Sequence, residues 1–314
     1  MAEGSRRVLY AALAGNVLVA ISKFVATGFT HSSAMLSEAV HSLVDTSNEV
    51  LLIYGANRAA RPPDAEHPLG HGREVYFWSF VVSLLIFVFG ACFSVYGGVI
   101  HVLHPEPMEK PWVNYLVLVG AALFEGASWR VAFREFRSRK GANRSYLQAA
   151  QETKDPSTMM VFFEDSAALI GIAFALAGTA AAQLLGNPVY DGVASIAIGV
   201  LLAAVAAFLS HENKQLLIGE NARPQLAESL ERIATAEPGI AHFNGVLTFQ
   251  IAPRQVVVNM SLDFVATLTA REVQEIVARL EVHVRKEHQD VMLLLVKPQT
   301  PQAYQAAFKR RRAR

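Results

Sequence analysis

Long apolar stretches alternate with short polar ones over the first two thirds of the chain. A membrane-spanning helix needs about 20 mostly apolar residues, and six stretches reach that length. They are residues 8–29, 33–56, 76–101, 112–133, 157–184 and 190–210. The pattern therefore predicts six transmembrane helices, surrounded by membrane lipid, in a domain that covers residues 1–210.

From about residue 211 the pattern changes to that of a soluble domain. PQLAESLERIATA reads as an amphipathic helix, and a second helix begins at Thr269, which forms a capping box with Glu272. FNGVLTFQI and QVVVNMSLDF alternate as half-buried strands do, and VMLLLV supplies a third strand. The order helix–strand–strand–helix–strand predicts a small α+β (αββαβ) domain over residues 211–300. The remaining residues, 301–314, form a basic tail that we expect to be disordered.

The composition agrees with a membrane protein. Of the 314 residues, 52% are hydrophobic and 18% are charged, whereas about a quarter of a soluble protein's residues are charged. The net charge of +1 gives no indication of a nucleic-acid partner, and we expect none. A single cysteine, Cys92, excludes an intramolecular disulfide.

Basic residues are concentrated at the N-terminus and in the connections after spans two, four and six. These residues are Arg6, Arg7, Arg58, Arg61, Arg73, Arg134, Arg137, Arg139, Lys140, Arg144, Lys154 and Lys214. The other three connections contain only Lys110. Because Lys and Arg are enriched in cytoplasmic loops, we expect both termini to be cytoplasmic. We expect the protein to lie in a bacterial inner membrane.

Span two carries a stripe of polar side chains. Its members lie on or beside one face of the helix, and they are Glu38, His41, Asp45, Asn48 and Glu49. An ionisable side chain at the bilayer centre costs roughly 2.5–3.5 kcal/mol on insertion scales. An imidazole and a carboxylate one turn apart can bind one divalent cation, which would compensate for that cost. By itself, the short HxxxD spacing is also explained by a hydrogen bond between His41 and Asp45.

Span five contains a second acidic site, because Glu164 and Asp165 are adjacent in apolar surroundings. Packing of span two against span five would bring His41, Asp45 and Asp165 together, with Glu164 about 100° around the helix. The two spans therefore predict a metal site with three or four ligands. In span four, Glu125 is a further buried acid, which we interpret as a structural hydrogen-bonding group.

With these features, the chain resembles the cation diffusion facilitator family of divalent-metal/proton antiporters. The matching features are HSLVD at 41–45, Asp165, HPLGHGR at 67–73, and six spans followed by an αββαβ domain. The resemblance covers nearly the whole chain. It implies a homodimer held in part by cytoplasmic domains with a metallochaperone-like fold. It also implies export of metal from the cytoplasm, driven by inward movement of protons.

One position departs from the usual pattern of that family. Most members carry a second HxxxD in span five, but here Val161 stands four residues before Asp165. The pair Glu164–Asp165 resembles instead a minority branch, the mitochondrial zinc transporters of animals. Loss of a histidine makes the site richer in oxygen, which favours harder ions. We expect Zn²⁺ as the transported ion, with Mn²⁺, Fe²⁺, Co²⁺ or Cd²⁺ as alternatives, and a fourth ligand from Glu164, Glu38, Asn48 or water.

The connection after span two contains a second candidate metal site. Asp64, His67 and His71 match a secondary cytoplasmic metal site of some family members. An equally good interpretation is that the stretch 70–72 only makes the turn into span three. We expect a poor metal site, or none, in the soluble domain, because its last strand lacks the His and Asp of metal-binding relatives.

The ligand types predict how metal and protons exchange. Metal binds neutral imidazole and ionised carboxylate, so protonation of the same groups releases it. Two alternatives from other classes are an intramembrane metalloenzyme, in which His41, Asp45 and Asp165 activate water, and a metal sensor that does not transport. We do not expect an enzyme, because the sequence shows no separate acid/base or nucleophile constellation.

Overall fold

The computed structural model describes residues 3–139 and 154–312. The chain divides into two compact units. One unit comprises Met1–Arg61 and Glu74–Lys214, and the other comprises Pro62–Arg73 and Gln215–Arg314. The loop after span two thus belongs to the second unit, which the sequence did not predict. Lys140 and Arg144, two of the basic residues used to predict orientation, lie outside the described residues.

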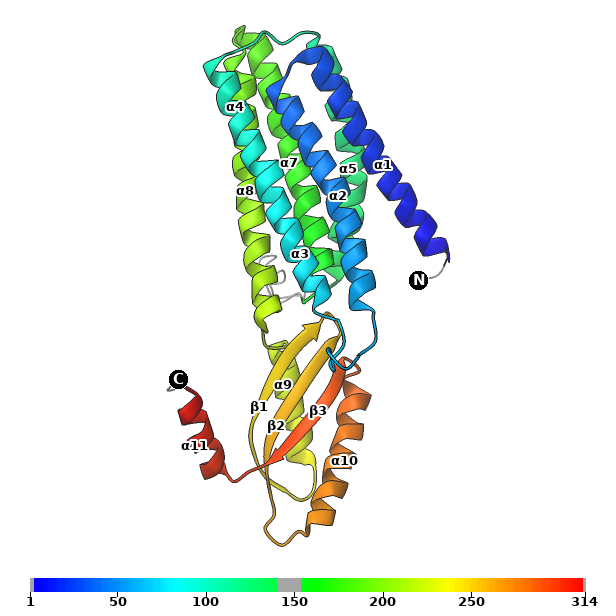
Figure 1. Ribbon diagram of the computed structural model, residues 1–314, viewed down its shortest axis with the longest axis vertical. Coiled ribbons are helices and arrows are strands. Elements are labelled where there is room, and N and C mark those ends of the chain that lie inside the picture. Colours follow the sequence, from blue (N-terminus) through cyan, green and yellow to red (C-terminus); the bar gives the residue numbers. More distant parts are fainter. Residues whose placement is uncertain (1–2, 140–153, 313–314) are drawn as a thin grey trace. The chain divides into compact units, whose positions relative to one another are not determined.

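The first unit is a bundle of long helices (Figure 1). Five of the six predicted spans each fall within a single helix, and the third extends over three consecutive segments. The segments are α1 (Glu3–Thr30), α2 (Ser33–Ala59), α3 (Glu74–Leu85), the π-helical segment η1 (Ile86–Cys92), α4 (Phe93–Leu103), α5 (Pro111–Arg139), α7 (Pro156–Leu185) and α8 (Val189–Ile218). Helices α3, η1 and α4 follow one another without a break and form the third span.

Four helical stretches among the described residues are long and apolar enough to cross a membrane. They are Glu74–Leu103, Pro111–Arg134, Met159–Leu185 and Val189–Ile218. Helix α1 contains a shorter apolar stretch, Gly15–Thr30. Helix α2 is of comparable length, but its polar stripe sets it apart from these helices in composition.

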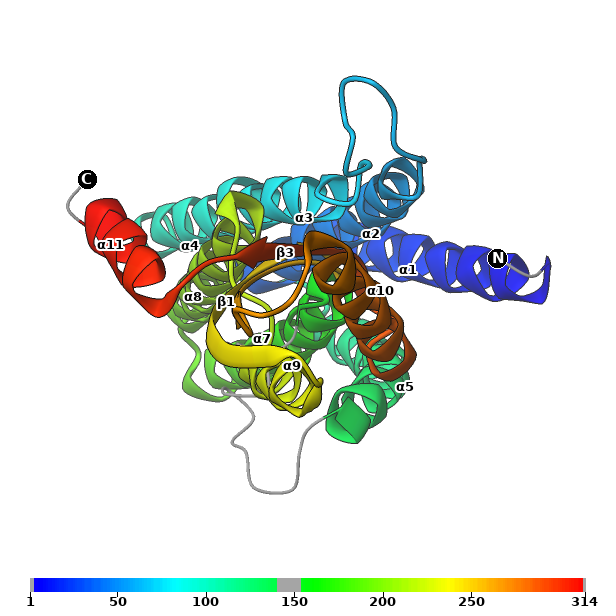
Figure 2. The same cartoon turned by 90° about the horizontal axis from the view of Figure 1, so that it is seen from below.

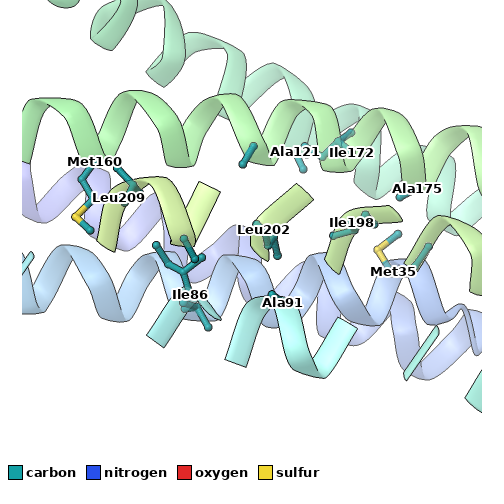
Figure 3. Close-up of a cluster of buried hydrophobic side chains, with 14 of the residues drawn as sticks. Met35, Ile86, Ala91, Ala121, Met160, Ile172, Ala175, Ile198, Leu202 and Leu209 are labelled. Atoms are coloured by element: carbon teal, nitrogen blue, oxygen red, sulfur yellow. The ribbon is translucent and has the colours of Figure 1, made fainter. Parts of the chain in front are cut away.

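An apolar core holds the bundle together (Figure 3). It contains side chains from α2, η1, α7 and α8 that are less than 2% exposed, among them Met35, Ile86, Ile172 and Leu202. Helices α4 and α8 approach closely, since a Cβ added to Gly98 would lie 2.7 Å from the carbonyl oxygen of Gly192. Small residues allow such close packing between membrane helices.

The second unit has the predicted αββαβ order. Its elements are α9 (Pro224–Ala236), β1 (Ile240–Ala252), β2 (Gln255–Phe264), α10 (Ala270–Glu287), β3 (Val291–Pro298) and α11 (Pro301–Arg312). The sheet order is β1-β2-β3, with β1 antiparallel and β3 parallel to β2. Helices α9 and α10 pack on one face of the sheet, where Leu230, Met260 and Leu280 are buried together (Figure 2). The predicted capping box of Thr269 and Glu272 begins α10.

The tail predicted to be disordered, residues 301–314, instead forms α11 up to Arg312. Thr300 begins this helix, because its Oγ1 accepts a hydrogen bond of 3.3 Å from the Ala303 N–H. Pro301 occupies the first helical position, where a missing N–H costs nothing. Tyr304 then packs against Gly245 of β1. Residues 313–314 lie outside the described part of the chain.

Candidate metal centre

Polar side chains of α2 are buried in the helix bundle of the first unit. His41 and Asn48 are almost fully buried, and the side chain of Asp45 is 17% exposed. His41 Nδ1 lies 3.2 Å from Asp45 Oδ1, but the two atoms lack hydrogen-bond geometry. Both ring nitrogens of His41, Asp45 Oδ1 and Asn48 Oδ1 are buried without a hydrogen-bond partner. Buried polar atoms are rarely left unsatisfied, so these atoms on one helix are candidates for binding an ion.

The two predicted acids of α7 connect it to different helices. Glu164 is buried and its Oε1 accepts a 2.7 Å hydrogen bond from Asn48 Nδ2 of α2. Asp165 Oδ2 accepts a 2.9 Å hydrogen bond from Ser128 Oγ of α5. The acids therefore join α7 to α2 on one side and to α5 on the other.

Asp45, Glu164 and Asp165 line one small cavity of about 20 Å³. A volume of roughly 10–15 Å³ is enough for one water molecule, so the cavity has room for one ion-sized occupant. All of its lining residues are Asn16, Ser42, Asp45, Glu49, Glu125, Val161, Glu164 and Asp165. The lining contains five acids and no basic residue, and His41 is not part of it. The cavity thus brings the three predicted acids together. His41 lies outside its lining but contacts one lining residue, Asp45.

The predicted transport ligands are less closely gathered than the loop residues. Among the described residues, the group of three possible ligands found within 4.8 Å of one another is Asp64, His67 and His71. His41, Asp45, Glu164 and Asp165 form no such group. The assignment of those four residues to a single transport site therefore stays a prediction.

The sequence did not predict an ion pair between α1 and α2. Lys23 Nζ lies 2.9 Å from Glu38 Oε2 and donates a 2.7 Å hydrogen bond to Ser42 Oγ, and both charged side chains are fully buried. The sequence offered Glu38 as a possible fourth ligand of the transported ion. One oxygen of Glu38 is instead bound to the lysine, while the other lies against Gly171 of α7.

Two further polar residues hold the stripe of α2 in place. Asn16 Nδ2 of α1 donates a 2.7 Å hydrogen bond to Glu49 Oε1. Asp191 of α8 accepts hydrogen bonds from Ser32 Oγ (2.7 Å) and from the Ala34 N–H (3.2 Å), where α2 begins. Isolated polar residues in apolar spans were the signal for both groups, but the sequence could not supply their partners.

Glu125 of α5 differs from our interpretation of it as a structural hydrogen-bonding group. Its side chain is buried, yet it forms no hydrogen bond or ion pair with any residue that the structure describes. The reason is its position, because the carboxyl group faces the acidic cavity rather than a donor on a neighbouring helix.

The loop of the second unit gathers all three residues of the second predicted site. His71 Nε2 lies 2.9 Å from Asp64 Oδ2, and His67 Nδ1 lies 3.3 Å from Asp64 Oδ1. The backbone N–H of His67 and the imidazole of His71 lower the pKa of the Asp64 carboxyl to about 2. Gly70 makes the turn with a φ of 77°, so the turn and the cluster predicted as alternatives occur together.

A model of the cation efflux transmembrane domain matches residues 9–218, which contain all six predicted spans except the first residue of span one. The chain belongs to the cation efflux family. Over 274 residues, 87% of the chain, it is 35% identical to the "Proton-coupled zinc antiporter SLC30A9, mitochondrial" of Xenopus laevis, of which it covers 49%. It is 36% identical over 223 residues to "Metal tolerance protein C4" of Arabidopsis thaliana, with 69% of the chain and 48% of that protein covered.

A bacterial relative is matched over more of its own length. The "Cation-efflux pump FieF" of Cronobacter sakazakii is 27% identical over 254 residues, which are 81% of the chain and 79% of that protein. The chain spans about half the length of the animal and plant relatives that it matches. The family and these names are those of multi-pass membrane transporters and not of enzymes, so the metalloenzyme alternative finds no support.

Proposed function

We propose that this protein is a divalent-cation/proton antiporter that exports Zn²⁺ from the cytoplasm. The observation that carries this proposal is the set of buried, unsatisfied ligand atoms on α2, next to an acidic cavity of ionic size. The name of the Xenopus laevis relative, a proton-coupled zinc antiporter, supports the choice of ion and counter-ion.

The proposed ligands of the transported ion are His41, Asp45 and Asp165, with Glu164 beside them. In the state open to the cytoplasm, neutral His41 and the ionised acids bind the ion. When the helices move and expose the site to the opposite side, protons compete for the same lone pairs and the ion leaves. Histidine is the side chain that ordinarily gains and loses a proton between about pH 5 and 8. Each return movement of the empty transporter therefore carries a proton inward.

The choice of Zn²⁺ over its neighbours is part of the proposal. An imidazole suits Zn²⁺, whereas a lining rich in carboxylates also suits Mn²⁺, Fe²⁺ and Co²⁺. A panel of Zn²⁺, Mn²⁺, Fe²⁺, Co²⁺ and Cd²⁺ on reconstituted vesicles tests the choice. Faster transport of Mn²⁺ or Fe²⁺ than of Zn²⁺ would show that Zn²⁺ is not the preferred substrate. The protein would still be a divalent-cation transporter.

Substitution of two α2 residues tests the transport site. His41→Ala and Asp45→Ala should each abolish proton movement that depends on Zn²⁺, because each removes a ligand that also binds protons. The measurement is the fluorescence of a pH-sensitive dye trapped in vesicles that contain the purified protein. His242→Ala, on an exposed position of β1, is the matched control and should transport normally. Normal transport by either α2 variant would contradict the assignment.

We also propose that the loop of Asp64, His67 and His71 binds a divalent cation of its own. The support is the close approach of their ligand atoms and the ionised carboxylate of Asp64. A His67→Ala, His71→Ala variant should bind one Zn²⁺ fewer per chain by equilibrium dialysis, while its membrane ligands stay intact. An unchanged number of bound ions would contradict this second site.

The remaining proposals concern the protein in its membrane. We place both termini in the cytoplasm of a bacterial cell, with the chain in the inner membrane. We divide the chain into a transmembrane domain (1–210) and a cytoplasmic domain (211–300) that joins two copies into a homodimer. The alternation of basic residues supports the orientation, and family membership supports the division.

A further inference from the structure

Glu125 on α5 is a buried acid with no assigned role. Its side chain is 8% exposed, and no residue in the described part of the chain donates a hydrogen bond to it or pairs with it. An ionised side chain inside a membrane domain is expensive unless a cation or a donor compensates for it. In its ionised form, this side chain would therefore be stabilised by a cation bound beside it.

The position of Glu125 indicates what that partner is. Its side chain lines the same cavity of about 20 Å³ as Asp45 of α2 and Asp165 of α7. Ser128 lies three residues further along α5, on the same face of the helix, and donates the hydrogen bond to Asp165. The face of α5 that carries Glu125 is thus tied to the predicted ligand on α7.

The rest of the lining offers Glu125 no positive charge. The cavity contains no lysine or arginine among its lining residues. Lys23, the buried cation contributed by α1, is already bound to Glu38 and Ser42. Val161, at the position where most of the family carries a histidine, also lines the cavity and has no donor atom. Compared with most of the family, α7 therefore lacks one ligand at this cavity. The carboxyl group of Glu125 on α5 lines the same cavity.

We propose that Glu125 is a direct ligand of the transported cation, so that the ligands come from α2, α5 and α7. This inference rests on the proposed function and names a residue that the function did not assign. With His41, Asp45 and Asp165 it completes four nitrogen and oxygen ligands, the number that Zn²⁺ prefers. Glu164, which is already bonded to Asn48, then lies beside the ion rather than on it.

The test is metal binding by the full-length chain in detergent, in a His67→Ala, His71→Ala background that removes the loop site. Zn²⁺ affinity is measured by competition with a chelating dye. Glu125→Gln keeps the shape but removes the charge, and it should weaken binding at least about tenfold, the lower range for loss of an outer-shell partner. Glu125→Asp, which keeps the charge, should retain more affinity than the glutamine variant.

Bound Co²⁺ separates a ligand from a residue that only positions other ligands, because its visible absorption reports the atoms that touch the ion. Glu125→Gln should change this spectrum. Glu237→Gln, the same change at a buried acid of the second unit that is paired with Arg279, should leave both the spectrum and the affinity unchanged. A thermal melt of each variant confirms that it is folded.

Normal Zn²⁺ affinity of Glu125→Gln, or a weakened affinity with an unchanged Co²⁺ spectrum, overturns the ligand role of Glu125. Failure of the proposed function looks different. In that case His41→Ala and Asp45→Ala would also bind Zn²⁺ like the starting protein. Loss of binding in those two variants with normal binding in Glu125→Gln would contradict this inference alone.

Discussion

At the residue scale, the ion pair of Lys23 and Glu38 shows how the bundle accepts charge. Both side chains are fully buried, and their closest atoms are 2.9 Å apart. Such a pair adds little to the free energy of unfolding compared with apolar residues of the same size. Removal of one partner, however, leaves the other charge buried and uncompensated. The pair also neutralises the first acid of the α2 stripe.

Lys23→Ala should therefore lower the free energy of unfolding by about 3–5 kcal/mol, the usual cost of breaking a buried pair. Unfolding of the purified protein in mixed micelles, followed by circular dichroism, measures this change. The double variant Lys23→Ala, Glu38→Ala should lose less than the sum of the two single variants. Additive losses would show that the two residues do not stabilise each other.

The stability of the loop around Asp64, outside the helical bundle, should depend on pH. The pKa of Asp64 is lowered to about 2 in the folded loop, whereas an unperturbed aspartate has a pKa of about 3.9. A lowered folded-state pKa means that the ionised carboxylate stabilises the loop above about pH 4, and that this stabilisation is lost as the pH falls towards 2. Hydrogen exchange of the His67 N–H, corrected for its intrinsic pH dependence, should show the loss in this window. Asp64→Asn should show no such change.

Sequence reasoning reached some of these residues and not others, for a physical reason. His41 and Asp45 were predicted as ligands because helical periodicity places them on one face of a span, and Asp165 because it lies beside Glu164 in apolar surroundings. The partners of Lys23 and the isolation of Glu125 depend on which helices become neighbours. Periodicity within one helix does not contain that information.

At the scale of elements, local chemistry predicted most of the helices, but α5 and α8 continue to Arg139 and Ile218, beyond the predicted ends of these spans at residues 133 and 210. The six spans, α9 and the capped start of α10 follow from apolar length, Pro224 and Thr269. Helix α11 was missed, because its basic composition suggested a solvated tail. Its stabilising features are the Thr300 cap and the contact of Tyr304 with Gly245 of β1, a strand far away in sequence.

The cap of α10 allows a prediction at this scale. The Thr269 side chain accepts a hydrogen bond from the Glu272 N–H, and Glu272 Oε2 accepts one from the Thr269 N–H in return. Thr269→Ala should destabilise the start of α10 by about 1 kcal/mol. Hydrogen exchange of the first turn, measured by mass spectrometry, should become faster there and not in α9. Thr269→Ser should keep the slow exchange.

At the scale of the whole molecule, the fold class was predictable because motifs and element order together resembled one family. The membership of the loop 62–73 in the second unit was not predictable, because it depends on packing. Gly72 shows this packing, since a Cβ added there would lie 2.7 Å from the Cβ of Ala252 in β1.

The homodimer is a prediction of the family resemblance. Light scattering on the purified chain, corrected for detergent, should give twice the mass of one chain. The dimer should survive the variants His41→Ala and Glu125→Gln, because both lie in the membrane unit. A monomer at micromolar concentration would contradict this assembly.

The path of the chain has a mechanical consequence. The backbone leaves the helical bundle after Arg61 and re-enters it at Glu74, so the twelve residues between them form a connection that is fixed at both ends. An ion bound to Asp64, His67 and His71 would make this connection more rigid. The last turn of α2 and the first turn of α3 would be affected, because the connection is covalently joined to both helices. An ion bound to this loop would therefore restrict the motion of the helix that carries His41 and Asp45.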